Sequence, residues 1–122
     1  MYRYSLIEVK EALRYGSEEC PNIRMNLFSE ARDMNKWKEI KTSPFYKEMV
    51  EEVASKAERY LKEPIKAIPY SKYRLFSENG NRSEYQEYYY DRRARLNVFA
   101  FLSMLYGESK HIEALEDTIW AI

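Results

Sequence analysis

One stretch constrains the fold of this chain most strongly: residues Ser83 to Gly107, which read SEYQEYYYDRRARLNVFAFLSMLYG. It begins with Ser83 and, three residues later, Gln86, which is the spacing of a capping box. It ends at a glycine, the residue type that best accepts a left-handed C-terminal turn. Between these signals the pattern predicts a helix of about six turns, roughly 36 Å long. Because its second half, Leu96 to Tyr106, is apolar on nearly every face, we expect a central helix enclosed by other helices.

The first half of this stretch has a different character, because tyrosines alternate with charged residues. Such a segment is too polar for a core and too aromatic for an ordinary solvated face. We therefore expect the N-terminal half of the helix to emerge onto a polar, aromatic-lined surface. Its members are Tyr85, Tyr88, Tyr89, Tyr90, Asp91, Arg92, Arg93 and Arg95.

The composition sets limits on the class of protein. The chain has 122 residues, enough for one domain with a core, and its 20 basic and 20 acidic residues cancel. This balance argues against a broad nucleic-acid or membrane surface. Cys20 is the single cysteine, so no intramolecular disulfide can form. With no signal-peptide core and no apolar run long enough to span a membrane, we expect a cytoplasmic protein.

Four further helices are predicted from apolar spacing and from start and stop signals. Ser43 followed by Pro44 is a strong start signal, and the helix that follows has a single apolar face. We expect four or five helices packed antiparallel, with the Pro44 and Ser83 helices as the main hairpin. The four are Ser5–Gly16, about Glu30 to Lys41, Pro44–Lys62 and Lys110–Ile122.

Residues 63–82 are predicted to form a long internal loop. Pro64 and Pro69 forbid a continuous helix, and Asn79-Gly80 is typical of a tight turn. The loop contains apolar residues and more basic than acidic ones, and it leads directly into the tyrosine-rich helix. Loops this long inside a compact domain are often functional.

The sequence contains no motif for a metal site, a phosphate-binding loop or a dinucleotide-binding turn, so we expect no metal and no cofactor. His111 is the only histidine, and without partner ligands we expect it to cap a helix or lie on the surface. Two interpretations of the tyrosine-rich segment remain. Tyrosines stack on sugar rings and arginines bind carboxylates, which Arg82 and Arg92 would do here. Alternatively, the arginines pair with neighbouring acids and the tyrosines are core, and composition alone favours this second interpretation.

The segment from the 63–82 loop to the last helix resembles the N-terminal region of heparinase II/III-like proteins. The Phe45–Leu61 helix is also similar to an early helix of that family. The ordered points of similarity are Tyr70-Ser71, Arg74-Leu75-Phe76, Gly80-Asn81-Arg82, Arg92-Arg93-x-Arg95-Leu96 and the run from Leu115 to Ile122.

The resemblance implies an all-α fold of antiparallel helical hairpins that form an incomplete α/α toroid segment. Residues 1–122 would then be the N-terminal part of a toroid that continues beyond Ile122, and the uncapped end at Trp120-Ala121-Ile122 agrees with this. The C-terminal remainder of the polypeptide would be a partner of this segment. An open seam at the last helix would also permit self-association.

Lyases of this family cleave uronic-acid polysaccharides by β-elimination, so the resemblance implies an acidic polysaccharide or oligosaccharide as the ligand. The family's catalytic tyrosine and histidines match no position here, so the segment alone is expected to be inactive. For one wall of the sugar groove we assign Arg82 and Arg92 to acidic groups, Tyr89 and Tyr90 to stacking, and polar contacts to Asn79 and Asn81. The alternatives are a non-catalytic helical carbohydrate-binding or interaction domain and, less favoured by the balanced charge, a nucleic-acid module.

Overall fold

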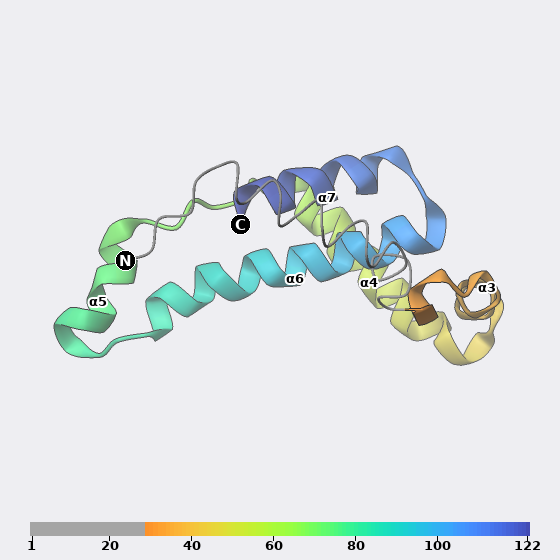
Figure 1. The fold of residues 1–122 in the computed structure, drawn as a ribbon, viewed down its shortest axis with the longest axis horizontal. Coiled ribbons are helices and arrows are strands. Elements are labelled where there is room, and N and C mark those ends of the chain that lie inside the picture. Colours follow the sequence, from red (N-terminus) through yellow and green to blue (C-terminus); the bar gives the residue numbers. More distant parts are fainter. Residues whose placement is uncertain (1–28) are drawn as a thin grey trace, which may run out of the picture. The chain divides into compact units, whose positions relative to one another are not determined.

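A computed structural model describes residues 29–122, and within them every regular element is a helix (Figure 1). The all-α prediction is therefore confirmed for this part of the chain, whereas the toroid arrangement stays a prediction. The chain divides after Lys36 into two units. The predicted Ser5–Gly16 helix and Cys20 lie outside the described residues.

The predicted Glu30–Lys41 helix is interrupted at Asp33. A short 3₁₀ helix, η1 (Ser29–Arg32), precedes it, and α3 (Met34–Thr42) follows. The Asp33 carboxylate accepts hydrogen bonds from the backbone N–H groups of Asn35 (3.0 Å) and Lys36 (3.2 Å). Aspartate is a strong N-cap residue, so it starts a new helix here instead of continuing the previous one.

The start signal at Ser43 is confirmed. The Ser43 hydroxyl accepts a hydrogen bond from the backbone N–H of Phe45 (3.3 Å), and a 3₁₀ turn, η2 (Pro44–Tyr46), leads into α4 (Lys47–Lys62). Proline at the first helical position has no N–H that the helix would need. The buried residues of α4 are Val50, Ala57 and Tyr60, on one face as predicted.

The predicted loop over residues 63–82 is wrong for half of its length, because α5 occupies Tyr70–Asn79. Pro69 does not break this helix but precedes its first residue, where a missing N–H costs nothing. The helix ends at Gly80, whose φ of 74° is left-handed and whose N–H donates to the Phe76 carbonyl (3.0 Å). Residues 63–69, before α5, and residues 80–82, after it, are the non-helical parts of the predicted loop.

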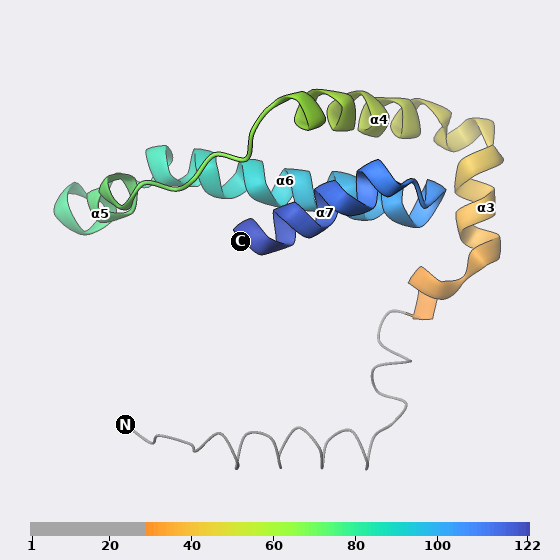
Figure 2. The ribbon, with the colours of Figure 1, turned by 90° about the horizontal axis from the view of Figure 1, so that it is seen from above.

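The long helix α6 spans Ser83–Tyr106, and α7 spans Ser109–Ala121. Gly107 ends α6 with a φ of 66°, as predicted. The predicted capping box does not form, because Ser83 is already helical and its N–H donates to the side-chain oxygen of Asn81 (3.0 Å). A short connection lets α7 run back along α6 (Figure 2), and α7 packs on α6 more extensively than α4 does. The main hairpin is therefore α6–α7.

Helices α4, α6 and α7 meet in one hydrophobic core. Its buried residues come from α4 and α6, and Ala114 and Leu115 of α7 pack against them; the buried residues are Ala57, Tyr60, Val98, Phe99 and Leu102. Phe99 and Leu102 are only 2% and 1% exposed, which confirms that the C-terminal half of α6 is central. The described helices cover it incompletely, because Met104 remains 46% exposed. The predicted enclosure on all faces is therefore only partial within residues 29–122.

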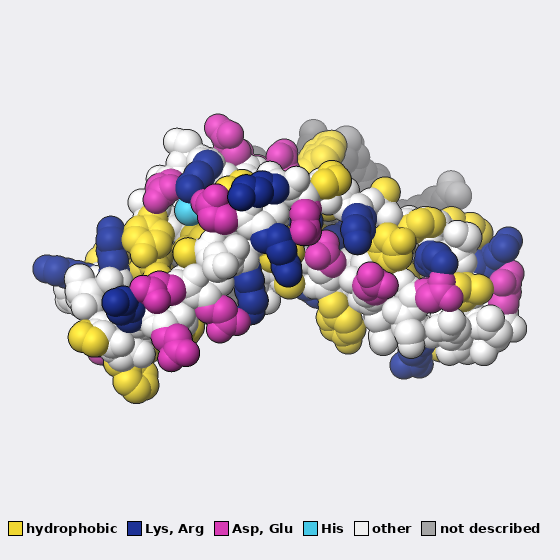
Figure 3. Space-filling view, turned by 180° about the vertical axis from the view of Figure 1, so that it is seen from behind, with side chains coloured by type: hydrophobic (Ala, Val, Ile, Leu, Met, Phe, Trp, Pro, Cys, Tyr) yellow, Lys and Arg dark blue, Asp and Glu magenta, His cyan; other side chains and the backbone are white. Residues whose placement is uncertain are grey.

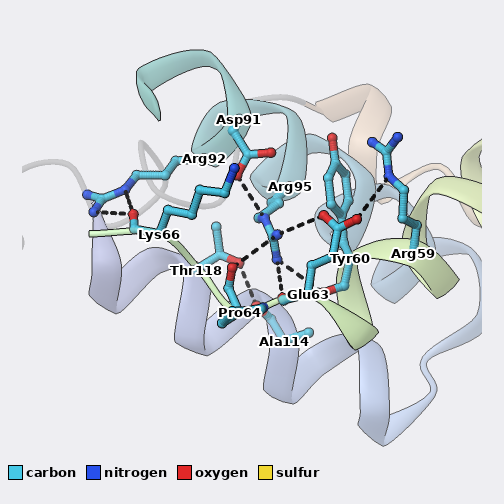
Figure 4. A network of polar contacts seen from close by, with 10 residues as sticks. All are labelled: Arg59, Tyr60, Glu63, Pro64, Lys66, Asp91, Arg92, Arg95, Ala114 and Thr118. Carbon is cyan, nitrogen blue, oxygen red and sulfur yellow. Dashed lines mark hydrogen bonds and ion pairs between the residues drawn. The ribbon is translucent and has the colours of Figure 1, made fainter. Parts of the chain in front are cut away.

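The buried Arg95 joins α6 to the C-terminal end of α4 (Figure 4). Its Nη1 donates to the carbonyls of Tyr60 and Glu63, both at 3.0 Å, and its Nε donates to Asp91 at 3.1 Å. The Tyr60 carbonyl would normally accept from the N–H four residues later, but that residue is Pro64. The prediction that Arg95 lies on the polar surface is therefore wrong. The side chain is buried, and its guanidinium supplies the donor that the Tyr60 carbonyl lacks from the backbone.

His111 lies in the core, so the predicted surface or capping role is wrong. It is 4% exposed, and its ring packs against Phe99 with centroids 6.4 Å apart. The face of α7 that meets α6 follows helical spacing through His111, Leu115 and Thr118. His111 lies on this face because it is four residues before Leu115 and seven before Thr118.

None of the helices within residues 29–122 is long and apolar enough to span a membrane. The opposite face of α7 is exposed, and Trp120 is 93% accessible to solvent. Self-association through this helix stays a prediction.

One ion pair between α4 and α7 predicts a measurable pH dependence. Lys110 donates to Glu58 (2.9 Å), and this hydrogen bond lowers the pKa of Glu58 below its ordinary value of 4.5. A carboxyl whose pKa is lower in the folded chain stabilises the fold above its unfolded pKa, and that contribution is lost as the pH falls through the folded pKa. We therefore expect Glu58→Gln to lower the melting temperature slightly at neutral pH, and we expect this effect to shrink as the pH falls below the ordinary pKa of 4.5. The control is Glu116→Gln, because Glu116 forms no ion pair with another described residue; a constant effect of Glu58→Gln at all pH values would contradict the assignment.

Candidate functional site

The most distinctive surface feature within residues 29–122 is a pocket between α5 and α6, which we call the tyrosine pocket. Its volume is about 240 Å³. Hydrophobic and basic side chains lie next to one another at the α5 end of the molecule (Figure 3). The pocket is lined by Tyr73 and Phe76 from α5, by Arg82, the residue just before α6, and by four residues from the first half of α6: Tyr85, Gln86, Tyr89 and Tyr90.

The lining follows from helical spacing. On α6, residues four apart lie one above the other on the same face. Arg82, Gln86 and Tyr90 form one such row, and Tyr85 and Tyr89 form the row beside it. Two adjacent rows of one helix therefore supply five of the seven lining residues.

The tyrosine rings form a continuous series, which we call the aromatic strip. Successive ring centroids are 6.2 Å apart for Tyr70–Tyr73, 5.7 Å for Tyr73–Tyr85, 6.0 Å for Tyr85–Tyr89 and 5.4 Å for Tyr89–Tyr90. The two ends are open to solvent, with Tyr70 72% exposed and Tyr90 60% exposed. A contiguous exposed aromatic patch of this kind is typical of a binding surface.

Arg82 is the cationic group of the pocket. Its guanidinium lies over the Phe76 ring, 4.6 Å from the centroid, and it has no hydrogen bond or ion pair with another described side chain. Stacking on a ring holds the plane of the guanidinium and leaves its N–H groups directed outward along that plane. Such a group can bind a carboxylate through two parallel hydrogen bonds.

The two helices of the pocket are held together by an ion pair. Lys72 on α5 donates to the carboxylate of Glu84 on α6, and this hydrogen bond raises the pKa of Lys72 above its ordinary value. The asparagines form the turn between the helices. Asn79 accepts from the N–H of Asn81 (2.9 Å), and the Asn81 amide group donates to Glu84 (3.4 Å). The structure thus places Asn79 and Asn81 in the turn beside the pocket, outside its lining.

Arg92 lies away from the pocket lining. Its Nε and Nη2 donate to the Lys66 carbonyl at 3.2 and 2.9 Å (Figure 4). Its Nη1 donates to the Ala121 carbonyl. The side chain therefore joins the 63–69 connection to the end of α7. With its donors engaged in this way, it supports the fold and does not contribute a free cation to the pocket.

Three of the six residues assigned from the sequence, Arg82, Tyr89 and Tyr90, come together in the pocket. The sequence assignment omitted the other four lining residues. The i, i+3 spacing of Tyr73 and Phe76 would have indicated them, had residues 70–79 been treated as a helix. The i, i+4 spacing of Tyr85 and Tyr89 was available from the predicted helix itself.

The chemistry of the pocket is that of binding. Aromatic faces and phenolic hydroxyls can contact a ring that has both apolar faces and hydroxyl groups, while the guanidinium binds an acidic group. Among the described residues no cluster of three or more histidine, cysteine or acidic side chains could hold a metal ion.

Comparisons with models of protein families, with curated proteins and with solved structures find no match to this chain. The resemblance to heparinase II/III-like proteins therefore stays a prediction from the sequence.

Proposed function

We propose that the tyrosine pocket binds an acidic saccharide and that it forms part of the sugar groove of a polysaccharide lyase. The observation that carries the binding proposal is the position of Arg82, an arginine without an ionic partner among the described residues, at the edge of five aromatic rings. A sugar carboxylate at Arg82 would place its ring beside Tyr85 and Tyr89.

The accessibility of the pocket suits a sugar better than a purely apolar ligand. Its rings are partly exposed, so a ligand would keep one face in water. Sugar rings meet this requirement because they have apolar faces and polar edges.

The lyase proposal rests on the sequence resemblance. In β-elimination a positive group neutralises the uronate carboxylate, a base removes the adjacent proton, and an acid protonates the leaving oxygen. Arg82 could serve the first role. A tyrosine acts as the base only if positive charge lowers its pKa, and the pocket lining contains neither a histidine nor a carboxylate. The composition of this lining favours the second candidate, a non-catalytic carbohydrate-binding domain, for the segment by itself.

Titration calorimetry of the chain with uronate-containing oligosaccharides, from heparan, chondroitin and alginate-type chains, tests the binding proposal. We expect at least one of them to bind and a neutral oligosaccharide of the same length not to bind. Arg82→Gln should weaken binding by about tenfold or more, as the loss of a charge-assisted hydrogen bond requires. The matched control is Arg74→Gln, which removes the same charge from α5, where Arg74 pairs with Glu78 (2.7 Å). Absence of binding, or equal binding of the neutral ligand, would contradict the proposal.

A further inference from the structure

Two arginines in residues 37–122 differ from the other arginines of that segment in having no hydrogen bond or ion pair from the guanidinium to another described residue. They are Arg82 and Arg93. Arg59 and Arg74 pair with carboxylates, and Arg92 and Arg95 donate to backbone carbonyls.

Both of these guanidinium groups stack on rings at the same site. Arg82 lies over Phe76 at 4.6 Å, and Arg93 lies over Tyr89 at 4.4 Å. Phe76 and Tyr89 line the tyrosine pocket, and Tyr89 also belongs to the aromatic strip. Both guanidinium groups therefore contact the aromatic surface that we propose as the binding site.

Their positions on α6 place them at opposite ends of this surface. Arg93 extends the row of Tyr85 and Tyr89 by one further turn, whereas Arg82 begins the neighbouring row. Eleven residues of helix separate them, which corresponds to about 16 Å along the axis. The two guanidinium groups also stack on rings from different helices, Phe76 of α5 and Tyr89 of α6, so they form two separate positive positions along the site.

We infer that the site takes an oligosaccharide in which acidic groups recur along the chain, with one acidic group at Arg82 and a second at Arg93. This inference rests on the proposed function and extends it from one ring to a stretch of glycan. Arg93 then determines how long a ligand must be, and how far apart its acidic groups must lie, for tight binding. The rings of Tyr85 and Tyr89 support the sugar between the two arginines.

The test compares ligands of increasing length from the same acidic glycan, from monosaccharide to hexasaccharide, on the intact chain and on two variants. For the intact chain we expect the affinity to rise about tenfold once a ligand spans both arginines. Arg93→Gln should remove this rise and change the affinity for the monosaccharide by less than about twofold. Arg82→Gln should lower the affinity for ligands of every length. Both side chains are exposed, so circular dichroism should show unchanged folding.

The outcomes separate the two proposals. If Arg82→Gln weakens binding but Arg93→Gln has no effect at any length, the second subsite is wrong and the single-ring site stands. If neither variant alters binding, or if no acidic saccharide binds, both proposals are wrong.

Discussion

Replacement of Arg95 by alanine is expected to lower the free energy of unfolding by about 3 kcal/mol. The side chain is 2% exposed, and its removal would leave the carbonyls of Tyr60 and Glu63 without their donor. The Tyr60 carbonyl has no backbone alternative because Pro64 lacks an N–H. The ring of Tyr60 would also lose the guanidinium that lies 4.6 Å from its centroid.

Chemical denaturation followed by circular dichroism measures this loss. Arg95→Met keeps most of the side-chain volume but no donor, so a loss close to that of Arg95→Ala would assign the effect to the hydrogen bonds. Arg93→Ala is the matched control, two residues away on the same helix but exposed, and should change the stability by less than about 0.5 kcal/mol. A loss below about 1 kcal/mol for Arg95→Ala would show that the guanidinium does not hold α4 to α6.

Phe99→Ala is expected to cost about 3–5 kcal/mol, the usual range for a large-to-small change in a core. Phe99 is 2% exposed and lies between α4 and α7, with ring centroids 6.4 Å from both Tyr60 and His111. Because three helices meet at this ring, they cannot fill the cavity without shifting relative to one another.

The same denaturation experiment tests this expectation. Phe45→Ala removes an equal volume from a position that is 84% exposed, and we expect a change of less than about 0.5 kcal/mol there. If the two phenylalanine variants lost similar stability, Phe99 would not be the centre of the core.

The sequence predicted the helices well where propensity and termination signals agree. Gly107 had to end α6, and Ser43-Pro44 had to start a helix, since both effects are local. The loop prediction for residues 63–82 failed because a proline breaks a helix from inside but is tolerated directly before its first residue. The sequence of residues 70–79 alone does not show which of these two positions Pro69 occupies. Arg95 and His111 could not be placed from the sequence, since their burial depends on the register of α6 and α7 against α4.

The candidate site was predictable only in part, for a related reason. Tyr89, Tyr90 and Arg82 lie in one helical segment, so local spacing places them together. Tyr73 comes from α5, and its contact with Tyr85 depends on the turn at Gly80. Arg92 has the same chemistry as Arg82, and only the three-dimensional structure shows that its donors are already used by backbone carbonyls.

The central claim, that the exposed aromatic half of α6 binds an acidic saccharide, is tested most directly by mapping the bound ligand with NMR. A ¹H–¹⁵N titration of the chain with a uronate-containing hexasaccharide should shift the amide signals around Arg82, Tyr85 and Tyr89. The signals of α7 should not move. Shifts confined to the exposed face of α7, or no shifts at saturating ligand, would contradict the account.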